Sequence, residues 1–212
     1  MSSICERTIT TCIAGSCTNP IYSGIEGKAY IFNRQEIEKF TFDTTTPNPN
    51  LITEITMGTY TSGGSDVAYT GYQIKQTGKQ PFTGTTTSMT EGNVMNKFTE
   101  NVSFVVPDNS PAAAMLLDNI ANGRFVVVLV NEYEGQDGKG KYQVFGSSKG
   151  LVCSAMERDA YSEDTDGGWS VTLTAEGSPK SAVFLEHTTT SGGETVVDTK
   201  SYLESITDDC ED

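Results

Sequence analysis

Histidine and tryptophan are scarce in this sequence, which holds one of each among its 212 residues. A catalytic triad needs a histidine beside an activated serine or cysteine. The only histidine, His187, precedes a run of threonines, and we expect its side chain to be exposed to solvent. The serines of Gly146-Ser147-Ser148-Lys149-Gly150 also lack the order of a nucleophile elbow. These features argue against a hydrolase of the triad type.

Cysteine occurs five times, but without a regular pattern, at Cys5, Cys12, Cys17, Cys153 and Cys210. An odd number at irregular spacing is not a disulfide framework. The first three permit a zinc site, yet no second pair and no histidine completes a set of four ligands. Free thiols in an N-terminal arm are the simpler interpretation.

Long apolar runs are absent as well. No stretch approaches the roughly 20 apolar residues that a membrane-spanning helix needs, so we expect no membrane partner. Residues 1–7 show no basic region followed by an apolar one, and we therefore expect no signal peptide. The chain is then expected to stay in the reducing cytoplasm where it is made.

Positive charge is in short supply, because 14 basic residues face 28 acidic ones and the formal net charge is -14. An acidic surface repels the phosphate backbone, which disfavours a protein that grips DNA. A channel lined with carboxylates, in contrast, lets DNA slide without adhering. Plain solubility also explains much of this charge, and the sequence leaves both interpretations open.

Threonine and glycine are abundant, and together they favour strands joined by turns. Short β-branched and aromatic segments recur along the chain and are broken by Gly, Pro and Asn. The predicted strands are 29–32, 40–42, 51–57, 98–106, 124–130, 141–146, 149–155 and 169–175, with edge strands at 182–185 and 195–197. This pattern predicts an α+β domain dominated by antiparallel sheet, either a β-sandwich or a partly closed barrel.

One helix interrupts the strands. Ser110 is a suitable N-cap, Pro111 fits the first helical position, and Gly123 ends the segment. Met115, Leu116 and Ile120, with Ala112, predict the buried stripe, and the helix is expected to pack outside the sheets.

The strand that follows the helix is continuously apolar from Phe125 to Val130, which predicts that both of its faces are covered. A glycine-rich turn then leads to its hairpin partner at 141–146. Residues 58–92, in contrast, are polar and rich in Thr and Gly. They are expected to form an extended loop, either a hairpin that projects until a partner covers it or a mobile surface loop.

Other segments resemble binding motifs only in part. Glu163-Asp164-Thr165-Asp166-Gly167 resembles a calcium loop but lacks its closing glutamate, so a solvated turn is favoured. Gly138-Lys139 lacks the spacing of a phosphate-binding loop. Trp169 with Tyr161 permits a sugar platform, although a tryptophan on an alternating strand is more often part of the core. We therefore predict no enzyme, no catalytic, cofactor-binding or metal-ligating residue, and no cofactor.

The order of elements from about residue 98 to about residue 179 carries a resemblance. A strand and a capped helix lead to Arg124-Phe125-Val126-Val127-Val128-Leu129, then to Tyr142-Gln143-Val144-Phe145-Gly146, and after an acidic loop to Gly168-Trp169-Ser170-Val171-Thr172-Leu173. This order is similar to that of tail-tube-like and ring structural proteins of tailed bacteriophages, the crAss-like group of Bacteroides-infecting phages included. The opening residues 3–8 and 19–21 resemble the same group.

The resemblance implies a tail-tube-like β-sandwich or barrel with one flanking α-helix, repeated in a hexameric or dodecameric ring. Stacked rings would form a tail tube or head–tail connector that conducts DNA. It implies as partners the chain itself, adjacent ring, portal or tail proteins, and phage DNA in transient passage, within a virion assembled in the host cytoplasm. A carbohydrate- or receptor-binding β-sandwich module is the alternative.

The expected organisation has three parts. Residues 1–27 form an N-terminal arm, residues 28–200 form a single domain with the extended loop at 58–92, and residues 201–212 form an acidic C-terminal tail. The arm and the extended loop are the expected contacts with neighbouring subunits, since such segments can become ordered on assembly.

Overall fold

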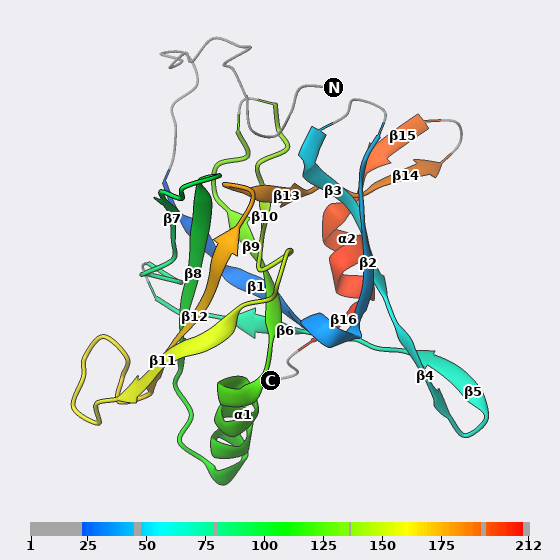
Figure 1. The fold of residues 1–212 in the computed structure, drawn as a ribbon. Coiled ribbons are helices and arrows are strands. Elements are labelled where there is room, and N and C mark those ends of the chain that lie inside the picture. The colour runs from blue at the N-terminus through cyan, green and yellow to red at the C-terminus, as the bar shows by residue number, and fades with distance from the viewer. Residues whose placement is uncertain (1–22, 45–47, 79, 136, 192–193, 210–212) are drawn as a thin grey trace.

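The computed structural model describes residues 23–44, 48–78, 80–135, 137–191 and 194–209. These residues are mainly strand, with two α-helices, so the prediction of an α+β fold dominated by antiparallel sheet is confirmed. Two large sheets and two small hairpins make up the described part (Figure 1). Residues 1–22, which hold Cys5, Cys12 and Cys17, lie outside the described residues, as does Cys210.

The larger sheet has eight strands in the order β16-β6-β1-β9-β10-β13-β3-β2. Most neighbours are antiparallel, but β13 runs parallel to β3 and β16 parallel to β6. The strands are β1 (Ile25–Asn33), β2 (Ile37–Asp43), β3 (Asn48–Met57), β6 (Gly71–Lys75), β9 (Phe125–Asn131), β10 (Tyr142–Phe145), β13 (Val183–Leu185) and β16 (Thr207–Asp208).

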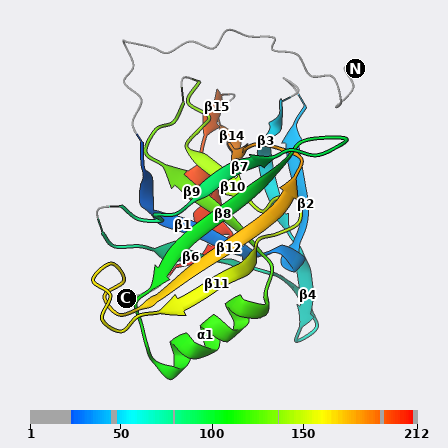
Figure 2. The same ribbon diagram turned by 60° about the vertical axis from the view of Figure 1, so that its left-hand side comes forward.

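The smaller sheet has four strands in the order β11-β12-β8-β7 and lies in front of the larger one in Figure 2. Its strands are β7 (Thr86–Thr90), β8 (Lys97–Val106), β11 (Val152–Arg158) and β12 (Trp169–Ser178). Inward side chains of β8 and β12, such as Val102 and Leu173, pack against Val127 and Leu129 of β9. This contact between the sheets forms the first hydrophobic core.

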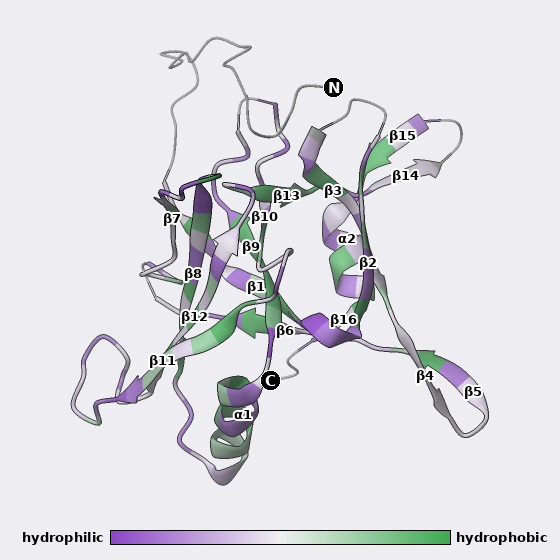
Figure 3. Cartoon of the chain, in the orientation of Figure 1, coloured by the Kyte–Doolittle hydropathy of each residue, from purple (hydrophilic) through white to green (hydrophobic). Residues whose placement is uncertain are grey.

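β9 separates two cores. Val127 and Leu129 face the first core, while Val126 and Val128 point the other way into a second one, and all four have 0% of their surface exposed. The prediction that both faces of this strand are covered is therefore confirmed. Figure 3 shows the apolar colour on β9 and on strands beside it.

A second helix, α2 (Thr199–Ser205), fills the second core. Leu203 is fully buried there and packs with residues of β1, β3 and β9, among them Phe32 and Ile52. Figure 1 shows α2 beside β2 and β3. The structure therefore adds a helix to the single flanking helix that was expected. Residues 199–208 fold into α2 and β16 rather than continuing as an acidic tail.

The first helix, α1 (Pro111–Asn122), has the expected ends. The Ala113 amide donates to the Ser110 hydroxyl at 3.2 Å, and Pro111 occupies the first turn. Gly123 follows with φ −88°, outside the left-handed region, and glycine is needed there because an added Cβ would lie 2.1 Å from the Phe125 ring.

The buried face of α1 differs from the expected one. Ala113, Leu117 and Ile120 are buried, whereas Met115 and Leu116 are 66% and 50% exposed. The predicted stripe was right only for Ile120. Residues 112–117 are apolar all round, so the sequence does not fix which side turns inward.

The segment 58–92 divides between a projection and the body. β4 (Thr59–Ser62) and β5 (Ser65–Ala68) form a hairpin that extends away from the sheets (Figure 1). β6 joins the larger sheet, β7 joins the smaller one, and Phe82 between them is buried. Only 59–68 therefore stands outside the body.

Three further predictions need correction. The strand at 182–185 was expected at an edge, but β13 lies between β10 and β3, because strand order is set by tertiary packing. β14 (Thr188–Ser191) and β15 (Glu194–Val197) form a separate hairpin instead of an edge of a large sheet. Residues 25–27, which were expected in the N-terminal arm, belong to β1.

Candidate functional site

The β4–β5 hairpin is the most prominent candidate for contact with another chain. All eight of its strand residues are exposed, and it forms a two-stranded sheet of its own. Gly63 and Gly64 both have positive φ, as a two-residue hairpin turn of this kind requires. An isolated two-stranded hairpin is marginally stable in water, so a covering surface would stabilise this one.

One face of the hairpin is apolar. Tyr60 and Val67 lie directly opposite each other and are 44% and 39% exposed. The ring of Tyr69 lies 4.8 Å from that of Tyr60, which extends the patch toward the body. On the opposite face the Thr61 hydroxyl donates to Asp66 at 3.2 Å. The hairpin thus presents one apolar and one polar face.

Strand edges offer a second kind of contact. β7 pairs only with β8, and all five of its residues are exposed, with Met89 at 60%. β2 lies at an edge of the larger sheet. Val94, in the turn between β7 and β8, is 88% exposed. An edge strand with free backbone groups can pair with a strand of another chain.

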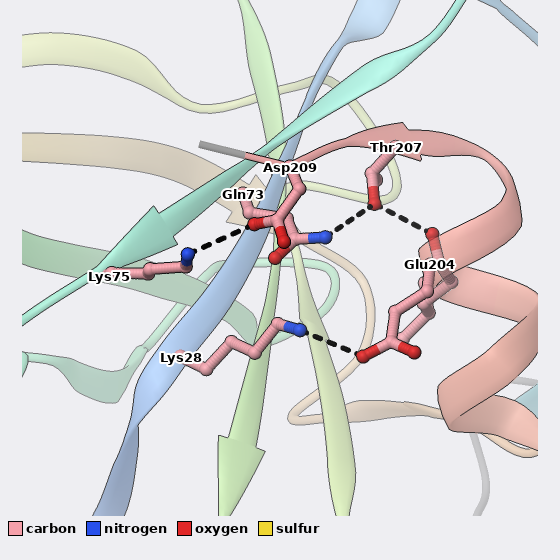
Figure 4. A network of polar contacts seen from close by, with 7 residues as sticks. Lys28, Gln73, Lys75, Glu204, Thr207 and Asp209 are labelled. Atoms are coloured by element: carbon pink, nitrogen blue, oxygen red, sulfur yellow. Dashed lines mark hydrogen bonds and ion pairs between the residues drawn. The ribbon is translucent and has the colours of Figure 1, made fainter. Parts of the chain in front are cut away.

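The acidic residues near the C-terminal end take part in a polar network (Figure 4). Glu204 pairs with Lys28 of β1 at 2.9 Å, and Asp209 pairs with Lys75 of β6 at 3.1 Å. The Thr207 hydroxyl donates to the Leu203 carbonyl at 2.8 Å. These contacts hold α2 and β16 across the strands β1 and β6, and they use carboxylates of the segment that was expected to be an acidic tail.

His187 is half-buried, which makes the expectation of a solvent-exposed histidine wrong. Its Nδ1 lies 2.9 Å from the Thr53 carbonyl, and its ring stacks on that of Tyr202 at 4.0 Å. The Tyr202 hydroxyl donates to the Ile55 carbonyl at 2.7 Å and accepts from the Ile55 amide at 2.8 Å. Burial raises the pKa of Tyr202. The pair therefore completes the hydrogen bonding of β3 beyond the end of β13.

Glu100 of β8 is a buried carboxylate that was not predicted from the sequence. Its side chain accepts from the Gly146 amide at 2.7 Å and also hydrogen-bonds with Ser178. Burial is the main cause that raises its pKa. The alternation of β8 could have indicated its burial, because Glu100 lies on the same face of the strand as Val102 and Phe104. This carboxylate joins β8 to β10 and is placed to support the fold.

The acidic loop is a hydrogen-bonded turn. The Gly168 amide donates to the Thr165 carbonyl at 2.8 Å, and Arg158 Nε donates to the Gly167 carbonyl at 2.9 Å. Beside the loop lies an open hollow of about 280 Å³, lined by Glu157, Arg158, Asp159, Ser162, Thr165 and Ser170. Within the described ranges, no group of three or more His, Cys, Asp or Glu side chains is arranged to hold a metal ion.

The two aromatic residues of the possible sugar platform are in different environments. Trp169 is partly buried and packs against the first core, whereas Tyr161 is 95% exposed in the acidic loop. Cys153 is a free, partly buried thiol whose pKa is raised, mainly by burial. Neither arrangement builds a recognisable binding site.

Comparison of the chain with protein-family models, with curated proteins and with solved structures found no match. In the described part of the chain, no helix has the length and apolar character needed to cross a membrane.

Proposed function

We propose that this chain is a non-catalytic structural protein of a phage virion, which assembles with copies of itself into a ring or tube segment of the tail or head–tail connector. The observation that carries the proposal is the β4–β5 hairpin, which stands off the body with an apolar face of Tyr60 and Val67. A face of this kind gains stability when another chain buries it. The resemblance of residues 98–179 to tail-tube-like proteins is the reason for proposing a phage tail or connector as the assembly.

Ring formation needs two different surfaces on each copy, related by a rotation that closes. The exposed edge β7 and the hairpin are two such surfaces, and they belong to different sheets. The net charge of -14 supports a wall along which DNA slides without adhering. Neighbouring ring, portal or tail proteins would contact the faces left open after ring closure.

The test is the state of assembly of the purified full chain. Sedimentation velocity and negative-stain images over a range of concentrations are expected to show rings with hexameric or dodecameric symmetry. A chain that remains monomeric at every concentration and ionic strength would contradict the proposal. Detection of the protein in purified particles by mass spectrometry provides the second measurement.

A matched pair of variants tests the hairpin. Tyr60→Ser with Val67→Ser removes the apolar face and is expected to weaken assembly. Thr59→Ser with Ala68→Ser changes the opposite face of the same hairpin and is expected to assemble normally. If the two variants assemble equally well, the apolar face of the hairpin is not part of the interface between copies.

A further inference from the structure

Four cations gather at one end of the smaller sheet. Lys97 begins β8, Lys149 precedes β11, Arg124 precedes β9, and Arg34 lies between β1 and β2. The first three are exposed and Arg34 is partly buried. Within the described ranges, none of the four belongs to an ion pair, whereas Lys28, Lys75, Lys139 and Lys141 each have a carboxylate partner.

The backbone holds three of these cations together. The Arg34 amide donates to the Arg124 carbonyl at 2.8 Å, and Arg124 Nη1 donates to the Lys149 carbonyl at 3.4 Å. A Cβ added to Gly150 would lie 3.2 Å from Arg34 Cβ and 3.3 Å from Arg124 Cβ. The two arginine side chains therefore leave the backbone side by side.

Lys97 joins the group at Gly177 of β12. A Cβ added at Gly177 would lie 3.4 Å from Lys149 Nζ and 3.6 Å from Lys97 Cδ. The turn that carries Lys149 is fixed by the Gly150 amide, which donates to the Gly146 carbonyl at 2.8 Å. Lys97, Arg124 and Lys149 thus lie close together, with Arg34 beside them, although the Arg34 guanidinium lies over the Phe40 ring at 5.4 Å. These four residues are here called the basic corner.

The other end of the same sheet is acidic. β8 and β11 finish there and β12 begins there, so the loops after Val106 and Arg158 lie together. Arg158 is turned onto the Gly167 carbonyl at 2.9 Å. The exposed carboxylates of this acidic end are Asp108, Glu157, Asp159, Glu163, Asp164 and Asp166.

The two ends differ strongly in charge. Four carboxylates lie around the basic corner. Glu36 accepts from the Asn33 amide group at 3.0 Å, and Glu100 is buried on the Gly146 amide at 2.7 Å. Glu91 follows Thr90, the partner of Lys97, and Glu176 precedes Gly177. The seven residues of β11 separate the ends by roughly 23 Å at the usual rise per residue of a strand. That separation is more than twice the Debye length of about 8 Å at physiological salt, so the two ends do not neutralise each other within one chain.

We propose that the basic corner of one copy binds the acidic end of a second copy, so that copies join head to tail along the strands of the smaller sheet. This inference rests on the proposed function, and it names a second copy of the chain as the partner of the basic corner. A second copy is the occupant that the charges favour, because a chain with a net charge of -14 repels nucleic acid but carries its own acidic complement. The contact joins two different surfaces, as a ring or tube requires.

Charge reversal in the full chain tests the contact. Arg124→Glu with Lys149→Glu is expected to weaken association in sedimentation velocity by about tenfold or more, since several exposed pairs are lost together. Lys39→Glu with Lys200→Glu is the matched control, because it makes the same change in net charge at exposed lysines elsewhere. Adding Glu163→Lys and Asp164→Lys to the first variant exchanges two charges at each end, so that new pairs of opposite charge can form, and is expected to restore part of the association.

The outcomes separate this inference from the proposed function. Rings that form equally well with Arg124→Glu and Lys149→Glu overturn the head-to-tail contact and leave the ring proposal standing. A wild-type chain that is monomeric under all conditions overturns both. Binding of a DNA duplex that is lost in the same variant, with assembly unchanged, assigns the basic corner to nucleic acid and overturns the inference.

Discussion

Glu100 shows what a single residue does in this fold. Its carboxylate lies in the first core, held by the Gly146 amide, and burial raises its pKa above the usual value. The native state therefore binds this proton more tightly than the unfolded chain. The stability that comes from protonated Glu100 is fully present below the unfolded pKa and is lost as pH rises through the folded one.

Replacing Glu100 with Gln should raise the free energy of unfolding at neutral pH, because a neutral amide of the same shape still accepts from Gly146. Each pKa unit between the native and unfolded carboxyl corresponds to about 1.4 kcal/mol. The gain should disappear as pH falls below the unfolded pKa, in urea unfolding at a series of pH values. Glu176→Gln, an exposed site on β12, is the control, and parallel pH profiles for wild type and Glu100→Gln would contradict the prediction.

Tyr202 acts through its hydroxyl, which makes both hydrogen bonds with the backbone of Ile55. Tyr202→Phe leaves a donor and an acceptor of β3 without partners in a partly buried place. The expected loss is about 1–3 kcal/mol of unfolding free energy in chemical denaturation. Tyr161→Phe, at a fully solvated ring, should leave the midpoint unchanged.

At the scale of elements, the ends of a helix were easier to predict than its buried side or the place of a strand in its sheet. Ser110, Pro111 and Gly123 define α1 by local chemistry, so its boundaries were readable from the sequence. The buried side of α1 was not readable, nor was the place of β13 between β10 and β3, because packing against distant strands decides both. α2 was missed since it has only seven residues and takes its stability from Leu203 in the second core.

The cap of α1 offers a test at this scale. Ser110→Ala removes the acceptor of the Ala113 amide and should cost about 1 kcal/mol of unfolding free energy. Ser110→Thr keeps the hydroxyl and should cost much less. Denaturant midpoints measure both, and an alanine variant as stable as the wild type would show that water replaces the cap.

At the scale of the whole molecule, one excess of charge acts on two equilibria in opposite directions. Self-repulsion in a chain of net charge -14 destabilises the compact state, while the proposed contact between copies depends on attraction between opposite ends. Raising salt from about 0.05 M to about 0.5 M screens both effects. The melting temperature of dilute protein should therefore rise while association weakens, and a parallel change of the two quantities would contradict this account.

The position of α2 bears on how the chain is made. β1, β2 and β3 arise early in synthesis, yet the core that they enclose is completed by Leu203 and closed by the pairing of β16 with β6. During synthesis, one apolar face of these strands stays exposed until residues 199–208 have left the ribosome. A product cut after residue 198 should therefore be degraded or aggregate instead of folding, because the apolar side chains of β1, β3 and β9 in the second core would then stay open to solvent on the side that Leu203 covers.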